Sequence, residues 1–182
     1  TGGSYQKSNH EQVNNTYEII IMGLSQVITV WQSHFWRKRM NGILCADMDN
    51  TIIYSYKRNI GENKLNVELY NGREISFISE KTHDLLKKVS EKMTIIPTST
   101  RTEEQYKRID LDIGIVPYAL VCNGGVLLVN GKRDREWYLE SLQMIRNSIP
   151  EMEKAQQILA RDSRRKFELR FIDELFIFTK CE

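Results

Sequence analysis

Two carboxylates lie two residues apart in Asp47-Met48-Asp49-Asn50-Thr51, directly after the short apolar run at 43–46. Such a run predicts a buried strand, and open α/β sheets hold ligands at the carboxyl ends of their strands. Neighbouring carboxylates repel each other unless they share a proton or bind a cation, and magnesium prefers oxygen ligands. The pair therefore predicts a shared proton or a magnesium ion. For this pattern alone, a turn with a helix cap remains the alternative.

Two further polar clusters follow apolar runs in the same way. Pro97-Thr98-Ser99-Thr100-Arg101 follows the run at 93–96, and Asn123-Gly124-Gly125 follows the run at 119–122. The carboxyl ends of parallel strands meet at one edge of a sheet, and glycines let the backbone approach a ligand closely. We expect four side chains from three strand ends to converge there: Asp47, Asp49, Ser99 and Asn123.

The first cluster resembles the first motif of the haloacid dehalogenase superfamily, a hydrophobic strand followed by Asp-x-Asp-x-Thr. Most members of that superfamily transfer phosphoryl groups through an aspartyl phosphate. The resemblance implies that Asp47 is the nucleophile and that Asp49 is its acid/base partner. It also implies a magnesium site made by Asp47, Asp49 and the Met48 carbonyl, with Thr51 supporting the loop.

The other two clusters resemble motifs of the Cof-type and sucrose-phosphate phosphatases within that superfamily. Ser99-Thr100-Arg101 is similar to Thr-Gly-Arg, with Thr100 in place of the usual glycine, and Asn123-Gly124-Gly125 is similar to Asn-Gly-Ala. The hydroxyl that contacts the phosphate is assigned to Ser99, or to Thr98 if the strand ends one residue earlier. Arg101 either adds a positive charge beside the phosphate or begins a helix at the surface. The resemblance implies these phosphate-binding residues: Ser99, Thr100, Arg101, Asn123 and Gly124.

The fold class follows from the alternation of short apolar runs with polar, helix-like segments from Gly42 onward, which predicts an α/β fold. Residues 79–92, with Ser79 as the amino cap, and residues 102–109 have the pattern of crossover helices. The resemblance implies a Rossmannoid parallel sheet of the haloacid dehalogenase type, with helices on both faces and part of an α+β cap.

A flap is predicted immediately after the first motif, because residues 52–77 are long for a link between a strand and a helix. They contain Gly61 and an Asn71-Gly72 hairpin signal between apolar or β-branched residues. Such a hairpin could shield the site from water.

The predicted organisation has four parts: a flexible leader at 1–16, an amphipathic helix at 17–41, the amino-terminal part of the core at 42–130, and the start of an inserted α+β cap at 131–182. Polar residues interrupt the apolar stretch at 17–36, which favours a helix docked on the core, on a partner or on a second copy over one in a membrane. The cap is indicated by a helical stretch at 137–159 and an apolar alternation at 167–178.

Composition excludes several classes of protein. The formal net charge of +2, from 26 basic and 24 acidic residues, gives no field to hold nucleic acid. The cysteines, Cys45, Cys122 and Cys181, include no Cys-x-x-Cys pair, which argues against a disulfide framework or a structural zinc site and favours a reducing cytoplasm. The three histidines match no metal-ligand spacing.

The leading hypothesis is a magnesium-dependent phosphomonoester hydrolase acting on a small phosphorylated metabolite, with a sugar phosphate favoured. The superfamily also uses a later lysine and a Gly-Asp-x-x-x-Asp segment, and neither is found up to Glu182; Lys166 and Lys180 lie in the predicted cap and are not given the lysine's role. If the protein ends near that residue, a catalytically incomplete binding or regulatory protein is the alternative. A phosphotransferase or phosphomutase on the same scaffold is a third possibility.

Overall fold

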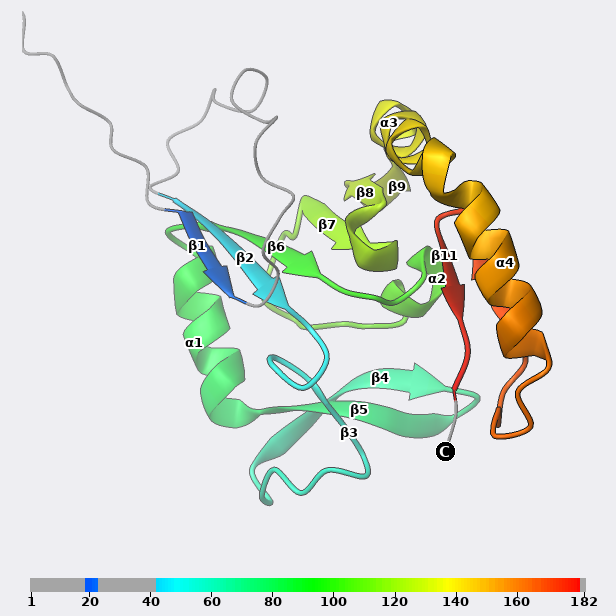
Figure 1. The fold of residues 1–182 in the computed structure, drawn as a ribbon. Coiled ribbons are helices and arrows are strands. Elements are labelled where there is room, and N and C mark those ends of the chain that lie inside the picture. Colours follow the sequence, from blue (N-terminus) through cyan, green and yellow to red (C-terminus); the bar gives the residue numbers. More distant parts are fainter. Residues whose placement is uncertain (1–18, 23–41, 181–182) are drawn as a thin grey trace, which may run out of the picture.

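The computed structural model describes residues 19–22 and 42–180 and shows an α/β fold (Figure 1). Its main sheet has six strands in the order β1-β2-β6-β7-β8-β9. The strands are β1 (Ile19–Met22), β2 (Ile43–Asp47), β6 (Thr94–Thr98), β7 (Tyr118–Val121), β8 (Val126–Val129) and β9 (Lys132–Arg133). The predicted leader at 1–16 lies outside the described residues.

The centre of the sheet is parallel, as predicted. Strand β2 pairs with β6 so that Asp47 lies opposite Thr98, and Thr98 in turn lies opposite Leu120 of β7. The carboxyl ends of these three neighbouring strands therefore meet at one edge of the sheet (Figure 1).

The far end of the sheet differs from the all-parallel prediction, because β8 and β9 run antiparallel to their neighbours. A 3-10 turn at Cys122–Gly124 and the Asn130-Gly131 turn connect β7, β8 and β9. Links this short can only reverse the chain, since a parallel return needs a crossover of about a dozen residues. The sheet is therefore mixed.

The amphipathic helix predicted for 17–41 is wrong at Ile19–Met22, which forms β1 and pairs in parallel with β2. Three consecutive isoleucines are β-branched and favour an extended strand, whereas the wider spacing of apolar residues suggested a helix. The rest of that predicted helix lies outside the described residues.

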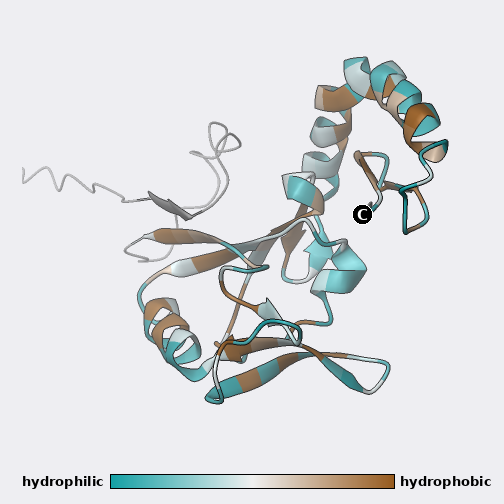
Figure 2. Cartoon of the chain, turned by 60° about the horizontal axis from the view of Figure 1, so that its bottom comes forward, coloured by the Kyte–Doolittle hydropathy of each residue, from teal (hydrophilic) through white to brown (hydrophobic). Residues whose placement is uncertain are grey.

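A separate antiparallel sheet follows β2 and contains β3 (Tyr54–Ser55), β4 (Lys64–Tyr70) and β5 (Arg73–Ser79) in the order β3-β5-β4. Strands β4 and β5 form the predicted hairpin, and its turn residues Asn71 and Gly72 both have positive φ, 51° and 72°. Asn-Gly is suited to such a turn, so the hairpin prediction is confirmed. Figure 2 shows alternating hydrophilic and hydrophobic bands along this hairpin.

The two predicted crossover helices differ in length. Helix α1 (Glu80–Ser90) begins as predicted at Ser79, whose Oγ accepts a hydrogen bond from the Thr82 amide, and it packs on β5 and β6. Helix α2 (Glu103–Tyr106) is one turn with a capping box, shorter than the predicted 102–109. It ends early because the chain then pairs with β4, where the Asp110 amide donates to the Val67 carbonyl at 2.9 Å.

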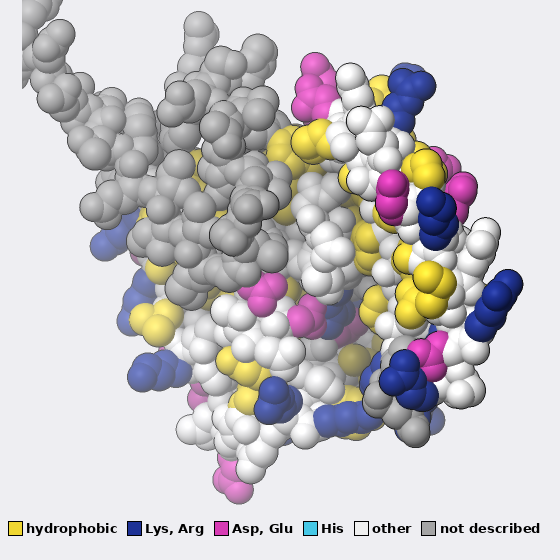
Figure 3. Space-filling view, viewed as in Figure 1, with side chains coloured by type: hydrophobic (Ala, Val, Ile, Leu, Met, Phe, Trp, Pro, Cys, Tyr) yellow, Lys and Arg dark blue, Asp and Glu magenta, His cyan; other side chains and the backbone are white. Residues whose placement is uncertain are grey.

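The carboxyl-terminal part has α+β character. It contains α3 (Arg135–Ile145), a 3-10 turn at Arg146–Ser148, α4 (Ile149–Ala160), and an antiparallel pair formed by β10 (Arg170–Ile172) and β11 (Phe176–Phe178). The predicted helical stretch at 137–159 is thus two helices, and Pro150 lies in the first turn of the second, where its missing N–H is tolerated. Figure 3 shows hydrophobic side chains at the surface over this part of the chain.

Two hydrophobic clusters form the core. One joins β2, the hairpin and α1, with Met48, Ile53 and Ile78 almost completely buried. The other joins β7 and β8 to the predicted cap, because Leu175 packs with Val121 and the neighbouring buried residues. Residues 131–180 therefore share a core cluster with the main sheet. Within the described residues, no helix has the length and apolar character needed to cross a bilayer.

Gly125→Ala is expected to destabilise this second cluster by about 1–3 kcal/mol. An added Cβ would lie 2.5 Å from Leu175 Cδ1 and 3.3 Å from the Cys122 carbonyl oxygen, so the buried Leu175 side chain would have to move out of its packed position. Urea unfolding measures the loss. Leu175→Val in the same chain should recover part of it, and equal stability of Gly125→Ala and wild type would contradict this packing.

Candidate active site

Asp47 is the last residue of β2, and its half-buried side chain lies at the edge where the parallel strands end. The Thr51 hydroxyl donates to Asp47 Oδ2 at 2.9 Å, which places Thr51 where the loop-supporting role was predicted. Within residues 42–180, Asp47 belongs to no ion pair. Its other oxygen, Oδ1, is therefore the candidate to act as a nucleophile or to bind a cation.

The loop after Asp47 is anchored by Met48, whose side chain is completely buried. The Met48 amide donates to the Thr98 carbonyl, and the Met48 carbonyl accepts from the amides of Ile52 and Ile53 at 3.0 and 2.9 Å. A carbonyl oxygen with two amide donors has used both lone pairs. In this geometry the Met48 carbonyl is engaged by the turn, and its role as a magnesium ligand stays a prediction.

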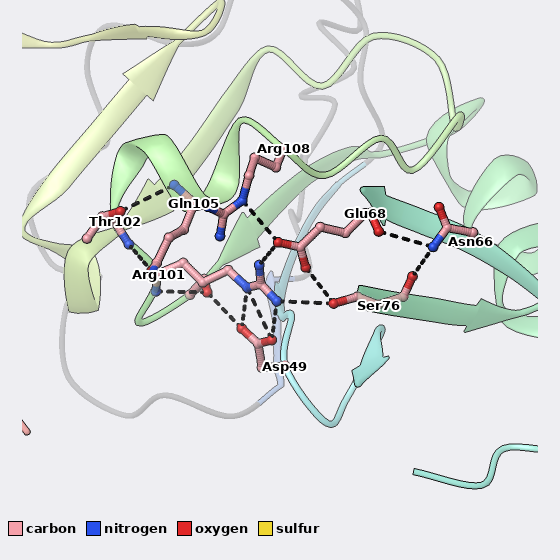
Figure 4. A network of polar contacts seen from close by, with 9 residues as sticks. Asp49, Asn66, Glu68, Ser76, Arg101, Thr102, Gln105 and Arg108 are labelled. Carbon is pink, nitrogen blue, oxygen red and sulfur yellow. Dashed lines mark hydrogen bonds and ion pairs between the residues drawn. The ribbon is translucent and has the colours of Figure 1, made fainter. Parts of the chain in front are cut away.

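Asp49 is held by Arg101 in a two-pronged ion pair. Arg101 Nε lies 2.9 Å from Asp49 Oδ2, and Nη2 lies 2.9 Å from Oδ1 (Figure 4). The Ser99 hydroxyl donates to Asp49 Oδ2 at 3.2 Å. The predicted convergence of Asp49 and Ser99 is therefore confirmed as a direct contact, and the like charges of the two aspartates are offset by a guanidinium group.

Arg101 is also held from its other side by Glu68 on β4. Arg101 Nη1 lies 2.9 Å from Glu68 Oε1, and Arg108 Nε lies 3.2 Å from the same oxygen. Glu68 Oε2 accepts a hydrogen bond from the Ser76 hydroxyl at 2.5 Å. Glu68 is only 1% exposed, so a buried carboxylate with three donors joins the hairpin to the strand ends (Figure 4).

An irregularity in β4 turns Glu68 inward. The pairing of β4 with β5 shifts register on both sides of Glu68, and the adjacent residues Val67 and Glu68 are both buried. Regular strands alternate between two faces, so a bulge is needed to bury two neighbours. The Asn66 side chain supports the bulge by donating to the carbonyls of Glu68 and Ser76, both at 3.1 Å.

Sequence reasoning missed Glu68, Ser76 and Arg108. Strict alternation along β4 would place Glu68 on the face opposite Val67 and thus away from the core. A charged residue inside a strand of the predicted flap was the available signal, but the bulge that reverses its direction has no mark in a single sequence.

Low pH should weaken the contact between Glu68 of the hairpin and Arg101. Burial raises the pKa of Glu68, but hydrogen bonds from Arg101 and Ser76 and the charges of Arg101 and Arg108 lower it, and the net pKa lies below the ordinary 4.5. A lowered folded-state pKa contributes stability that is present above the ordinary value and is lost as the pH falls through the folded value.

The free energy of unfolding of wild type should therefore exceed that of Glu68→Gln above pH 4.5, and this difference should shrink as the pH falls further. Urea unfolding at several pH values measures it. Glu74→Gln, at an exposed position in β5, is the matched control. A wild-type advantage over Glu68→Gln that stays constant down to strongly acidic pH would contradict the assignment.

The remaining predicted phosphate-binding residues lie near one another but differ in what they offer. Ser99 is 2% exposed and contacts Asp49, whereas Thr98 is the last residue of β6, so the hydroxyl beside Asp49 belongs to Ser99. Thr100 is exposed. The Asn123 amide donates to the Ser99 carbonyl at 3.2 Å, and the Asn123 side chain is exposed.

Gly124 is positioned by the predicted cap. Its φ is +85°, and its carbonyl accepts a hydrogen bond from Trp137 Nε1 of α3 at 2.8 Å. A residue with this φ is strained unless it is glycine, which accounts for glycine at the turn. The cap segment thus helps to fix the third motif beside the first two.

Cys122, beside this turn, is part of a structural contact. Burial and the neighbouring Asp173 raise the pKa of its thiol to about 12, and its Sγ lies 3.2 Å from Asp173 Oδ2. Asp173 also pairs with Arg133 at 2.8 Å, so this contact ties the β10–β11 turn to the main sheet. A thiol with a pKa this high is a poor nucleophile at neutral pH.

The donor set fits magnesium only in part. Among the described residues Asp47 offers a carboxylate with no ion pair, whereas both oxygens of Asp49 accept hydrogen bonds from Arg101, and the ligand role of Asp49 stays a prediction. In the part of the chain that the structure describes, no group of three or more His, Cys, Asp or Glu side chains could hold a metal ion. Asp47 is therefore the one predicted ligand whose surroundings suit a cation.

Comparisons with protein-family models and with curated proteins give no match to this chain.

Proposed function

We propose that this protein is a phosphomonoester hydrolase of the haloacid dehalogenase type that acts on a small phosphorylated metabolite through an aspartyl phosphate. One observation carries the proposal: Asp47, Asp49 and Ser99 meet at the ends of adjacent parallel strands, and only Asp49 of the two aspartates is held in an ion pair. An unpaired carboxylate beside a fixed one suits a division into nucleophile and acid/base partner.

The chemistry assigns the attack on phosphorus to Asp47 and both proton transfers to Asp49. Asp47 Oδ1 forms a bond to phosphorus while the bond from phosphorus to the ester oxygen breaks, and Asp49 gives a proton to that departing oxygen. Water then attacks the phosphorus of the aspartyl phosphate, Asp49 takes a proton from the water, and the bond to Asp47 breaks. Inorganic phosphate leaves, and both aspartates return to their starting forms.

Thr51 and Arg101 prepare the two carboxylates for these steps. Thr51 fixes Asp47 Oδ2, which leaves Oδ1 to approach phosphorus. Arg101 contacts both oxygens of Asp49 and so fixes the direction in which this carboxyl group faces the ester oxygen and the attacking water. Because Arg101 already pairs with two carboxylates, we assign it the role of orienting Asp49 in place of the predicted role of binding the phosphate.

The exposed side chains at the same strand ends, Thr100 and Asn123, are the groups of the second and third motifs that face solvent and can meet a phosphate oxygen. Magnesium enters the proposal through Asp47, which would hold it, and its charge would offset that of the phosphoryl group. A sugar phosphate remains the favoured substrate class on the resemblance of the motifs.

The test is hydrolysis of a panel of phosphomonoesters by the protein translated to its natural stop codon, with magnesium and with a chelator. We expect magnesium-dependent release of phosphate, and Asp49→Asn should slow it by about 100- to 10,000-fold, the usual value of general acid/base help. Residues 1–182 alone should be nearly inactive, because they contain neither the later lysine nor the Gly-Asp-x-x-x-Asp segment that the resemblance implies. No phosphate release from any ester by the translated protein would refute the proposal.

The second candidate is a catalytically incomplete binding or regulatory protein. The ion pairs of Arg101 with Asp49 and with Glu68 favour this candidate, because they give these charged groups partners without any ligand. Phosphorylated ligands that bind measurably but are recovered unchanged, with Asp47→Asn binding them as well as wild type, would support this candidate over the hydrolase.

A further inference from the structure

We infer that Glu68 is a positioning residue for the site, which holds the Arg101 guanidinium so that it orients the Asp49 carboxylate. The catalytic consequence of this inference rests on the proposed hydrolase function. The structural part, in which Glu68 controls Arg101, does not depend on turnover.

The first support is the set of donors on Arg101. Nε and Nη2 point to Asp49, Nη1 points to Glu68, and Nη2 also lies 3.4 Å from Ser76 Oγ. A guanidinium group is a rigid planar fork, so fixing Nη1 on one side fixes the direction of Nε and Nη2 on the other. Glu68 and Asp49 therefore hold opposite sides of one rigid group (Figure 4).

The second support is the burial of Glu68. Its side chain is 1% exposed, and taking a carboxylate out of water costs several kcal/mol before its partners repay it. An apolar side chain of similar size could hold a hairpin onto a core with equal or greater stability. We therefore attribute the charge at this position to its effect on Arg101, whose side chain is only 15% exposed and whose orientation it fixes.

The third support is how much of the hairpin is arranged around this carboxylate. Asn66 stabilises the bulge that turns Glu68 inward, and the Ser76 hydroxyl fixes its Oε2. Arg108 contacts Oε1 and lies 4.4 Å from the centre of the Tyr70 ring, so it is itself held by the hairpin. The position of Glu68 is thus determined from both hairpin strands before Arg101 is considered.

The structural test follows the Nε–H proton of Arg101 by NMR in the 182-residue chain labelled with 15N-arginine, with Arg101→Lys identifying the signal. Glu68→Gln removes the charge but keeps the shape and an oxygen acceptor. We expect exchange of the Arg101 Nε–H with water to rise about tenfold or more, because a weaker contact at Nη1 leaves the guanidinium group less firmly held and so weakens the hydrogen bond from Nε to Asp49. Glu74→Gln, which removes a charge from an exposed position of the same hairpin, should leave it unchanged.

Unchanged Arg101 exchange in folded Glu68→Gln would overturn the inference. If that variant does not fold, Ser76→Ala serves in its place, since it removes the hydroxyl on Glu68 Oε2 together with the longer 3.4 Å contact of that hydroxyl with Arg101 Nη2. A smaller rise in the same direction is then expected, and unchanged exchange there would count against the inference in the same way.

The catalytic test uses the protein translated to its natural stop codon. Glu68→Gln should lower kcat about 10- to 100-fold with little change in KM, as loss of an orienting contact does. In an Asp49→Asn background the same substitution should have almost no further effect, because the group that it orients is already lost. Equal fold losses in both backgrounds would show a general structural role and overturn the inference.

The proposed function and the positioning role of Glu68 can be refuted independently of each other. If Glu68→Gln frees Arg101 in the NMR experiment but wild type hydrolyses no phosphomonoester, the proposed function fails and the control of Arg101 by Glu68 stands. If wild type is active and neither Arg101 exchange nor kcat responds to Glu68→Gln, the proposed function stands and the positioning role is refuted.

Discussion

Asp47→Asn is expected to abolish phosphomonoester hydrolysis while leaving the fold intact. The amide keeps the volume of the carboxylate and an oxygen that can accept the hydrogen bond from Thr51. It loses the negative charge that attacks phosphorus and a hard oxygen ligand for magnesium, so covalent phosphoryl transfer has no route. Phosphate release from the best substrate of the panel measures the effect, and the thermal unfolding midpoint checks the fold.

Asn50→Ala is a suitable control, because Asn50 is an exposed neighbour with a φ of 63° that belongs to the loop and carries no assigned chemistry. It should keep most of the activity apart from a modest loss of stability at a left-handed position. Substantial magnesium-dependent turnover by Asp47→Asn would show that the nucleophile has been assigned wrongly.

Arg101→Ala is expected to lower the free energy of unfolding by about 3 kcal/mol. The substitution leaves Glu68 buried at 1% exposure with one guanidinium partner in place of two, and it leaves Asp49 beside Asp47 without its counter-ion. Arg101→Lys should recover only part of this loss, because an ammonium group cannot contact Asp49 and Glu68 with the same planar fork. Urea unfolding at neutral pH measures all three proteins.

Lys107→Ala provides the matched control in the next helical turn of the chain. Lys107 pairs with Glu103 at 2.7 Å, but its side chain is 50% exposed, so the loss should stay within about 0.5 kcal/mol. An Arg101→Ala variant as stable as Lys107→Ala would contradict the view that the buried ion pairs join the hairpin to the strand ends.

The features that could be predicted from the sequence are those with local marks. Asp47, Ser99 and Asn123 each follow an apolar run, and the parallel pairing of those runs brings their strand ends together. The Asn71-Gly72 turn is marked by residues that accept positive φ, and the start of α1 by the hydroxyl of Ser79. Each of these patterns depends on a few neighbouring residues, so one sequence suffices to see it.

The features that were missed depend on contacts between distant segments. Ile19–Met22 joins the sheet through pairing with β2, which outweighs the helical spacing around it. Glu68 becomes part of the site through a bulge in β4, and its partner Arg101 lies 33 residues away in the sequence. The Met48 carbonyl is used by the local turn, a hydrogen bond that the motif alone does not reveal.

Identifying the phosphorylated residue tests the central claim most directly. The protein translated to its natural stop codon would be mixed with its phosphomonoester substrate and magnesium, quenched in acid within one turnover, digested and analysed by peptide mass spectrometry. We predict one phosphoryl group, bonded to the side chain of Asp47 and absent from Asp47→Asn treated in the same way. A phosphoryl group on any other residue, or an active enzyme that never carries one, would contradict it.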